Sequence, residues 1–190
     1  MAHHLNPVLQ QSCNKISKCR IFFASLSGIP SFFHHSAKRT HMIELTGARR
    51  VPSLTDTCWS SNSKLLNVII GDWNKLKRAF ELILNSEDAD TKSVRLCNGF
   101  LNEMNNFEFT LLAVVFNDIF GYTDILFDVL QKKSLDIVYC AAKIKLTCDL
   151  ISNQRNEQHF SALFEKSKSL NDINFRRGCT ATEEELFAAI

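Results

Sequence analysis

The sequence predicts a mainly α protein built of long antiparallel helices, with little or no sheet. Gly and Pro number only 6 and 3 in 190 residues, which disfavours turn-rich β architectures. Hydrophobic residues make up 45% of the chain and 15 residues are Phe, a composition too apolar for disorder. Apolar residues also recur at steps of three and four along most of the chain, which is the period of an amphipathic helix.

Residues 1–52 are interpreted as an N-terminal helical unit. The Asn-Pro pair that begins at Asn6 provides a cap and a first helical residue, and the apolar period after it predicts a helix ending near Pro30. The histidine-rich stretch 31–45 has room for one or two further helical turns. Residues 46–57 have no apolar period and carry several turn residues, so we expect a loop there.

Residues 53–170 are interpreted as a bundle of three or four long antiparallel helices. The apolar face of the first, which begins near Thr57, comprises Leu65, Leu66, Ile69, Trp73, Leu76, Phe80 and Ile83. A shorter helix ends at the two asparagines 105–106, and a long apolar helix follows over 107–133. Its inward face is predicted to comprise Leu111, Val114, Val115, Ile119, Leu126, Val129 and Leu130.

The last long helix is predicted to begin at a Ser134 cap and to run to about Leu170. Its apolar residues follow the alternating four- and three-residue steps of a coiled-coil seam. They are Ile137, Ala141, Ile144, Cys148 and Ile151. Residues 171–190 form a tail with a further capping signature, Thr182 followed by Glu185, for which we expect a frayed helix or disorder.

Charge and cysteine usage limit the kinds of partner and compartment. The net charge of +2 provides no bulk field that would draw the whole molecule onto nucleic acid or an acidic membrane. No run reaches the roughly eighteen apolar residues of a membrane span, so we expect a soluble protein without a membrane partner. The 7 cysteines form no CxxC pairs and no secretory signal is present, which favours the cytosol or nucleus.

Residue types that bind metals are present without the spacing of a known kind of site. Surface histidines and core cysteines are the simplest interpretation of His3, His4, His34, His35, His41, Cys13 and Cys19. The acids of the long helices would in principle suffice for a two-metal site, although a solvated face is the simpler interpretation. These acids include Asp118, Asp124, Asp128, Asp136 and Asp149. We expect neither a metal nor a cofactor.

Two local features remain candidates for chemistry or binding. Cys58 lies near a predicted helix N-terminus, which favours a thiolate, but no histidine lies nearby in sequence to act as its base. A partly buried thiol is the alternative. A local basic patch lies in predicted loops, which would be able to contact the phosphates of DNA or RNA. The alternative is that these loops are solvated and bind no nucleic acid. The patch comprises Lys38, Arg39, Arg49 and Arg50, joined by His34, His35 and His41.

Four segments carry a family resemblance by their content and order. They are "HHLNPVLQQS", "CRIFFASLSGIPSFFHHSAKRT", "SLTDTCWSS" and "FEFTLLAVVFNDIFGYTDILFDVLQKKSLDIVYCAAKIKL". Together they resemble the transposase-like proteins of the hAT superfamily, including the zinc finger MYM-type-like proteins, over about residues 3–170. The resemblance implies the helical insertion of an RNase H-like transposase domain, with residues 1–52 as a remnant of the RNase H-like region.

The resemblance also implies that catalytic residues are missing. His3, Leu5 and Asn6 match the end of a segment that follows the family's second catalytic aspartate, so the first two catalytic carboxylates are expected to precede this chain. The third comes after the helical insertion, in a region to which the tail does not align. The zinc-binding DNA recognition module of the family is also missing. Without its carboxylates the chain is not expected to form a two-metal phosphoryl-transfer centre.

The segment "DTCWSS" resembles the family's Asp-Thr-Arg-Trp-Ser-Ser segment, with Cys58 where arginine is usual. In active relatives the Arg-Trp pair lies close to the catalytic centre. Trp59 retains an aromatic surface for stacking on an unpaired base, whereas Cys58 supplies no charge. Together with residues 49 and 50, this segment gives a candidate vestigial DNA-contact motif. Its members are Asp56, Trp59, Arg49 and Arg50.

The leading functional hypothesis is a non-catalytic, transposase-derived fragment of a hAT-like protein that is not an enzyme and whose remaining activity is DNA or protein binding. The alternative is a domesticated helical protein-protein interaction module of nuclear proteins, whose exposed Phe and Leu dock a partner protein or another copy. A third hypothesis is a DNA-end-binding remnant that uses Trp59 with the basic patch. The resemblance favours the nucleus over the cytoplasm.

Overall fold

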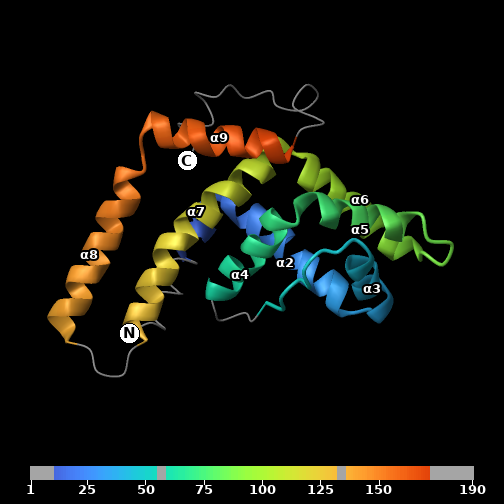
Figure 1. Cartoon of the computed structure of the whole chain (residues 1–190), viewed down its shortest axis with the longest axis horizontal. Coiled ribbons are helices and arrows are strands. Elements are labelled where there is room, and N and C mark those ends of the chain that lie inside the picture. Colours follow the sequence, from blue (N-terminus) through green and yellow to red (C-terminus); the bar gives the residue numbers. More distant parts are fainter. Residues whose placement is uncertain (1–10, 55–58, 132–135, 172–190) are drawn as a thin grey trace.

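The mainly α class is confirmed by the computed structural model, which describes residues 11–54, 59–131 and 136–171 and contains no strand in these ranges. The helices, labelled as in Figure 1, are α2 (Ser17–His34), α3 (Ala37–Leu45), α4 (Trp59–Gly71), α5 (Trp73–Leu84), α6 (Thr91–Asn105), α7 (Phe107–Leu130), α8 (Ile137–Asn153) and α9 (Glu157–Leu170). The predictions for Asn6, Pro7, Ser134 and residues 172–190 concern residues outside the described ranges.

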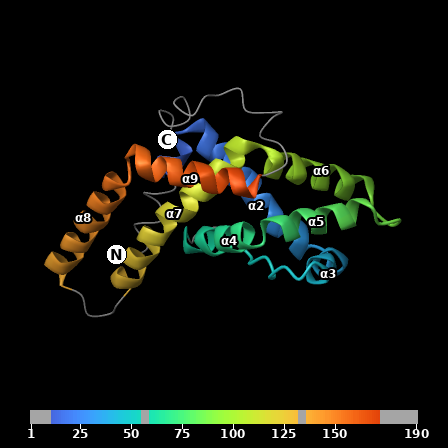
Figure 2. The ribbon, with the colours of Figure 1, turned by 45° about the horizontal axis from the view of Figure 1, so that its top comes forward.

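The central element is α7, which contacts α4 and α6 on one side of the molecule and α8 and α9 on another. Its predicted inward face is confirmed, because five of its seven residues are buried and Ile119 and Val129 are partly buried. By length and composition α7 would be able to cross a membrane. The core helix of a soluble protein passes the same test. Here α7 is surrounded by other helices and is therefore a core helix (Figure 2).

Aromatic rings fill the main core between α2, α5, α6 and α7. Phe33 and Phe80 lie with their ring centroids 5.1 Å apart, and Phe80 and Phe100 lie 5.3 Å apart. At the other end of α2, the rings of Phe22 and Phe116 stack at 5.6 Å. Such ring pairs add stabilisation beyond the burial of their area, so the Phe-rich segments contribute strongly to this main core.

Three predicted helix boundaries are wrong. The first helix does not end near Pro30 but continues to His34, because Phe32 and Phe33 beyond the proline are buried and their packing outweighs one lost backbone hydrogen bond. The helix predicted from Thr57 to about residue 85 is divided into α4 and α5 at Asp72, whose backbone is not helical.

The predicted helix from Ser134 to Leu170 is also divided, into α8 and α9. α8 begins after Asp136, whose side chain accepts a hydrogen bond from the backbone N–H of Val138. The chain turns at residues 154–156, and the side chain of Asn156 then caps α9 by accepting from the N–H of His159. A side chain that satisfies the free N–H groups of a new first turn favours a new helix over continuation of the old one.

The two parts of this divided helix differ in how they pack on α7. α9 lies across α7 and forms a small core with it, composed of Phe107, Leu111, Val115, Phe160 and Phe164. α8 is held by a smaller cluster of Leu126, Phe127, Leu130 and Cys140 near the end of α7. Figures 1 and 2 show α8 at the edge of the molecule, beside α7 and away from the main bundle.

Truncation of Leu76 should cost much of the stability of the fold. Leu76 lies in α5 and is 0% exposed, so Leu76→Ala removes buried methyl groups and leaves a cavity, with an expected loss of about 2–5 kcal/mol. Leu45 in α3 is 61% exposed, and Leu45→Ala should stay within about 0.5 kcal/mol of wild type. Urea unfolding followed by circular dichroism measures both. Equal losses in the two variants would contradict the described core.

Candidate functional site

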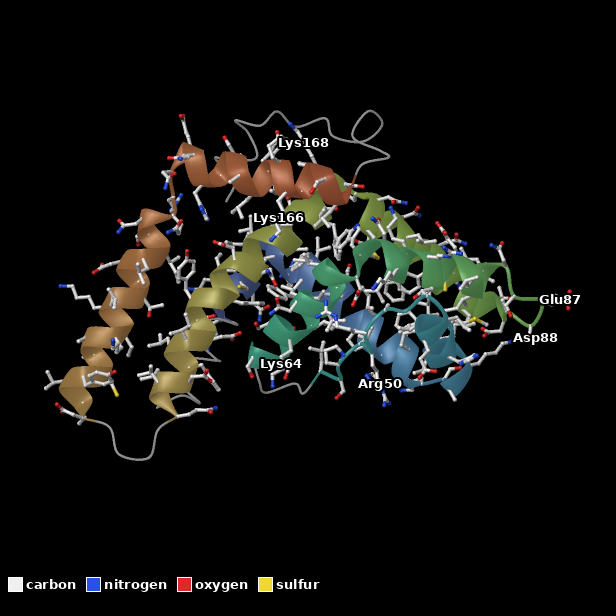
Figure 3. All side chains as sticks on the ribbon, in the orientation of Figure 1. Arg50, Lys64, Glu87, Asp88, Lys166 and Lys168 are labelled. Carbon is white, nitrogen blue, oxygen red and sulfur yellow. The ribbon has the colours of Figure 1, made fainter. Side chains whose placement is uncertain are left out.

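Of the four candidate DNA-contact residues, the structure describes the side chains of Arg49 and Arg50. Asp56 lies outside the described residues, and Trp59 begins α4. Arg49 and Arg50 lie in the connection between α3 and α4, and both are classed as exposed. Figure 3 shows Arg50 on the side of the molecule near α2 and α4.

Arg49 forms the junction between α4 and α5. Its Nε donates to Oδ2 of Asp72 at 2.7 Å, and its backbone N–H donates to the same oxygen at 3.1 Å. Its Nη2 donates to the carbonyl of Asn67 at 3.0 Å, in the last turns of α4. A Cβ at Gly71 would collide with this Nη2, so a larger residue there would displace the end of the Arg49 side chain. Arg49 therefore ties the end of α4 to Asp72 at the start of α5.

Asp72 is the buried anion of this junction, with a side chain only 6% exposed. Burial opposes its ionisation, but hydrogen bonds from Arg49 and Lys75 outweigh that effect and lower the pKa of Asp72 to about 2. Lys75 adds a bond of 3.1 Å from Nζ to Oδ1. A carboxylate surrounded by donors in this way remains charged and fixes the bend between the helices.

The other two cations of the basic patch also have protein partners. Nζ of Lys38 donates to Asp88 at 2.8 Å, and Figure 3 shows Asp88 at the turn between α5 and α6. Nη1 of Arg39 donates to the carbonyl of Phe32 at 2.8 Å, and its guanidinium lies 4.3 Å from the centre of the Phe32 ring. Hydrogen bonds already used within the fold leave fewer donors for phosphate, so these residues contribute first to structure.

Histidines near the patch, likewise, have local partners. Nε2 of His34 lies 3.0 Å from the carbonyl of Val51, and Nδ1 of His41 lies 3.4 Å from the carboxylate of Glu44. Nδ1 of His35 lies 2.5 Å from the carbonyl of Ser31, one turn earlier in α2. Among the residues that the structure describes, no group of three or more His, Cys, Asp or Glu is placed to hold a metal ion.

Three of the described thiols, those of Cys13, Cys19 and Cys97, are poor nucleophiles. Burial raises the pKa of both Cys13 and Cys97 to about 11, and burial also raises the pKa of Cys19. A thiol with a raised pKa is protonated at neutral pH and lacks the thiolate that reacts. His3, His4 and Cys58 lie outside the described residues.

The strongest candidate for a functional surface is α8, whose large apolar side chains are exposed on several faces of the helix. Its exposed large side chains include Ile137 (69%), Val138 (73%) and Tyr139 (46%), and further along Ile144 (41%), Leu146 (49%) and Leu150 (39%). Cys140 is the buried apolar residue of this helix. The predicted coiled-coil seam therefore exists as a pattern but does not pack inside the chain, because Ile137, Ala141, Ile144 and Cys148 are exposed and Ile151 is only partly buried.

The spacing in the sequence identified this seam but not what covers it. Sequence reasoning missed the structural role of Arg49 entirely, because the partner Asp72 lies 23 residues away in the sequence. The adjacent Gly71 and Asp72 within the predicted long helix were the sequence signal for a bend at this position. The chain matches no protein-family model and no solved structure.

The Arg49–Asp72 contact predicts a pH-dependent stability. The folded pKa of Asp72, about 2, lies below the value of about 3.9 for an unfolded aspartate, so its stabilisation is present above about pH 4 and is lost as pH falls towards 2. Asp72→Asn should lower the unfolding free energy at pH 7 by about 2 kcal/mol, and this difference from wild type should shrink below pH 4.

Thermal or urea unfolding of both proteins at a series of pH values measures this effect. Asp88→Asn is the matched control, because Asp88 also pairs with a cation but its side chain is 83% exposed, and a surface pair contributes little. A constant difference between Asp72→Asn and wild type from pH 7 to pH 2 would contradict the role given to Asp72.

Proposed function

We propose that this chain is a non-catalytic helical interaction module, of the transposase-derived kind that its hAT-like segments imply, and that it associates with a second copy of itself through α8. The observation that supports this most is the unpaired seam of α8. Soluble proteins seldom leave several large aliphatic side chains exposed along one helix, and such surfaces are typical of protein interfaces. A strict four-three spacing is typical of helices that pair in coiled coils.

The order of residues in the seam favours a second copy as the occupant. The exposed seam reads Ile137, Ala141, Ile144 and Cys148, so it alternates large and small side chains. In an antiparallel pair that places Ile137 opposite Cys148 of the second copy, Ala141 lies opposite Ile144. Every isoleucine then faces a small residue, and the seam is complementary to itself, as a two-fold interface requires.

The charges of α8 are compatible with the same arrangement. The segment 136–153 carries two acids and two lysines, Asp136, Asp149, Lys143 and Lys145, so two copies have no net repulsion. The seam itself carries no charged residue. Antiparallel packing also places the positive end of each helix dipole near the negative end of the other. Since α8 lies beside α7 in each copy, the two hairpins together would form a four-helix bundle.

No described arrangement of residues favours catalysis or DNA binding to the same degree. Three of the cations expected to contact DNA have partners within the fold: Arg49 binds Asp72, Lys38 forms a surface ion pair, and Arg39 lies over an aromatic ring. Arg50 is exposed, but one cation is a small electrostatic contribution to nucleic-acid binding.

A single charge in the seam should prevent self-association. Ile144→Lys places an ammonium group at the centre of the seam, where burial without a partner is unfavourable. Light scattering coupled to size-exclusion chromatography should give a dimer for wild type and a monomer of unchanged helicity for Ile144→Lys. Ile21→Lys in α2, where Ile21 is 60% exposed, is the matched control and should remain a dimer. A wild-type monomer at high micromolar concentration would refute the proposal.

Cross-linking should report the direction of pairing. In the antiparallel register, the two copies of Cys148 are separated along the helix axis by eleven residues, about 16 Å, whereas residue 137 of one copy lies opposite Cys148 of the other. With Cys58 and Cys179 changed to Ser, Ile137→Cys should therefore form an intermolecular disulfide with Cys148 on mild oxidation. The same background without Ile137→Cys should not. Efficient joining of Cys148 to Cys148 would indicate parallel pairing instead.

A further inference from the structure

α7 packs on α9 near one end of their contact and on α8 near the other, and a cavity separates these two contacts. One small core joins α7 to α9, and the other joins the end of α7 to the start of α8. Between them lies a cavity of about 420 Å³, lined by residues of all three helices. This volume is within the range of small-molecule sites, and a gap of this size between otherwise well-packed helices lacks the contacts that side chains normally supply.

Apolar surface forms most of the wall, and the polar groups of the lining belong to Asp118, Tyr122, Gln154, Arg155 and His159. The apolar lining includes Val115, Ile119, Ile151, Phe160 and Leu163. Asp118 and His159 meet in the same wall, with Nε2 of His159 3.0 Å from Oδ2 of Asp118. Their side chains are 30% and 24% exposed, so the pair is partly removed from water. An apolar cavity with a small set of converging polar groups is the usual form of a ligand site.

His159 is held in place by the helix that carries it. It lies in the first turn of α9, where its backbone N–H donates to the Asn156 cap at 2.8 Å. Asp118 uses Oδ2 for His159, and Oδ1 has no hydrogen-bond partner among the described residues. A carboxylate accepts several hydrogen bonds, so the Asp118–His159 pair retains acceptor capacity that a ligand is able to use.

The remaining groups of the lining favour a positive charge on that ligand. Tyr122 follows Asp118 by one helical turn on α7 and also lines the cavity, and an aromatic ring attracts a cation through its face. Arg155 is the competing group, but it is exposed, so water screens its charge more than that of Asp118. An anionic ligand would have to approach the less solvated carboxylate.

We propose that the cavity between α7, α8 and α9 binds an organic amine with an apolar body, whose protonated nitrogen contacts Asp118 and the ring of Tyr122. The cavity is formed within one copy of the chain and on the side of α8 that faces α7. The site is therefore independent of self-association, and it is tested in the Ile144→Lys variant so that the two proposals are judged separately.

Three compounds that share one apolar body test the charge preference. They are 4-phenylbutylamine, 4-phenylbutyrate and 4-phenylbutan-1-ol. The amine should bind with a dissociation constant on the order of 0.1–1 mM, as expected for a small ligand, and the other two should bind at least several-fold more weakly. Titration followed by NMR chemical shifts gives the affinities and shows whether residues of α7 and α9 respond. Equal binding of the carboxylate, or no binding of the amine, would overturn the proposal.

Variants assign the binding to this cavity. Asp118→Asn keeps the size of the side chain but removes its charge, and should weaken the amine about tenfold while leaving the alcohol nearly unchanged. Arg155→Ala removes the competing cation and should strengthen the amine and weaken the carboxylate. Leu163→Trp fills the cavity and should abolish binding of all three compounds. Unchanged amine affinity in Asp118→Asn or in Leu163→Trp, with the fold intact by circular dichroism, would reject the site.

Discussion

The structure depends on the need to cover α7. This helix is apolar on nearly every side, and its buried residues face α4 and α6 as well as α8 and α9. A helix of this kind has to lie in the interior of a protein, because a single partner covers only one stripe of its surface. The main bundle covers the first half of α7 well. The second half keeps contacts to the bundle through Phe120 in the main core and through the Ser63–Asp124 hydrogen bond, and its end packs on α8.

Much of the fold was predictable from the period of the apolar residues. The inward faces of α5 and α7 follow from that period, as do the break at Asn106 and the absence of strands in the described residues. The ends and bends of the helices were harder to predict from the sequence. Pro30 remains inside α2 because of buried aromatic residues beyond it, and the bend at Asp72 depends on Arg49, which belongs to a different segment. Contacts of long sequence separation leave no local pattern to read.

The surfaces with functional potential show a similar division. The seam of α8 was visible in the sequence, since its spacing is regular, but a spacing identifies a face and not the molecule that covers it. The cavity beside Asp118 and His159 had no sequence signal, because these residues are 41 positions apart and come together only through the turn before α9. The motif containing Asp56 and Trp59 stays a hypothesis carried by family resemblance, and Arg49 of that motif has acquired a structural explanation.

The small cluster that attaches α8 has a consequence for the dynamics of the protein. Among the described residues this cluster comprises Leu126, Phe127, Leu130 and Cys140, whereas the main core joins α2 to α7 through many rings. Parts of a protein with few buried contacts open at lower free energy than the whole molecule unfolds. Amide hydrogens of α8 should therefore exchange by a local opening that leaves the aromatic core intact. α8 would thus behave as a separate cooperative unit, which opens more often than the whole protein unfolds.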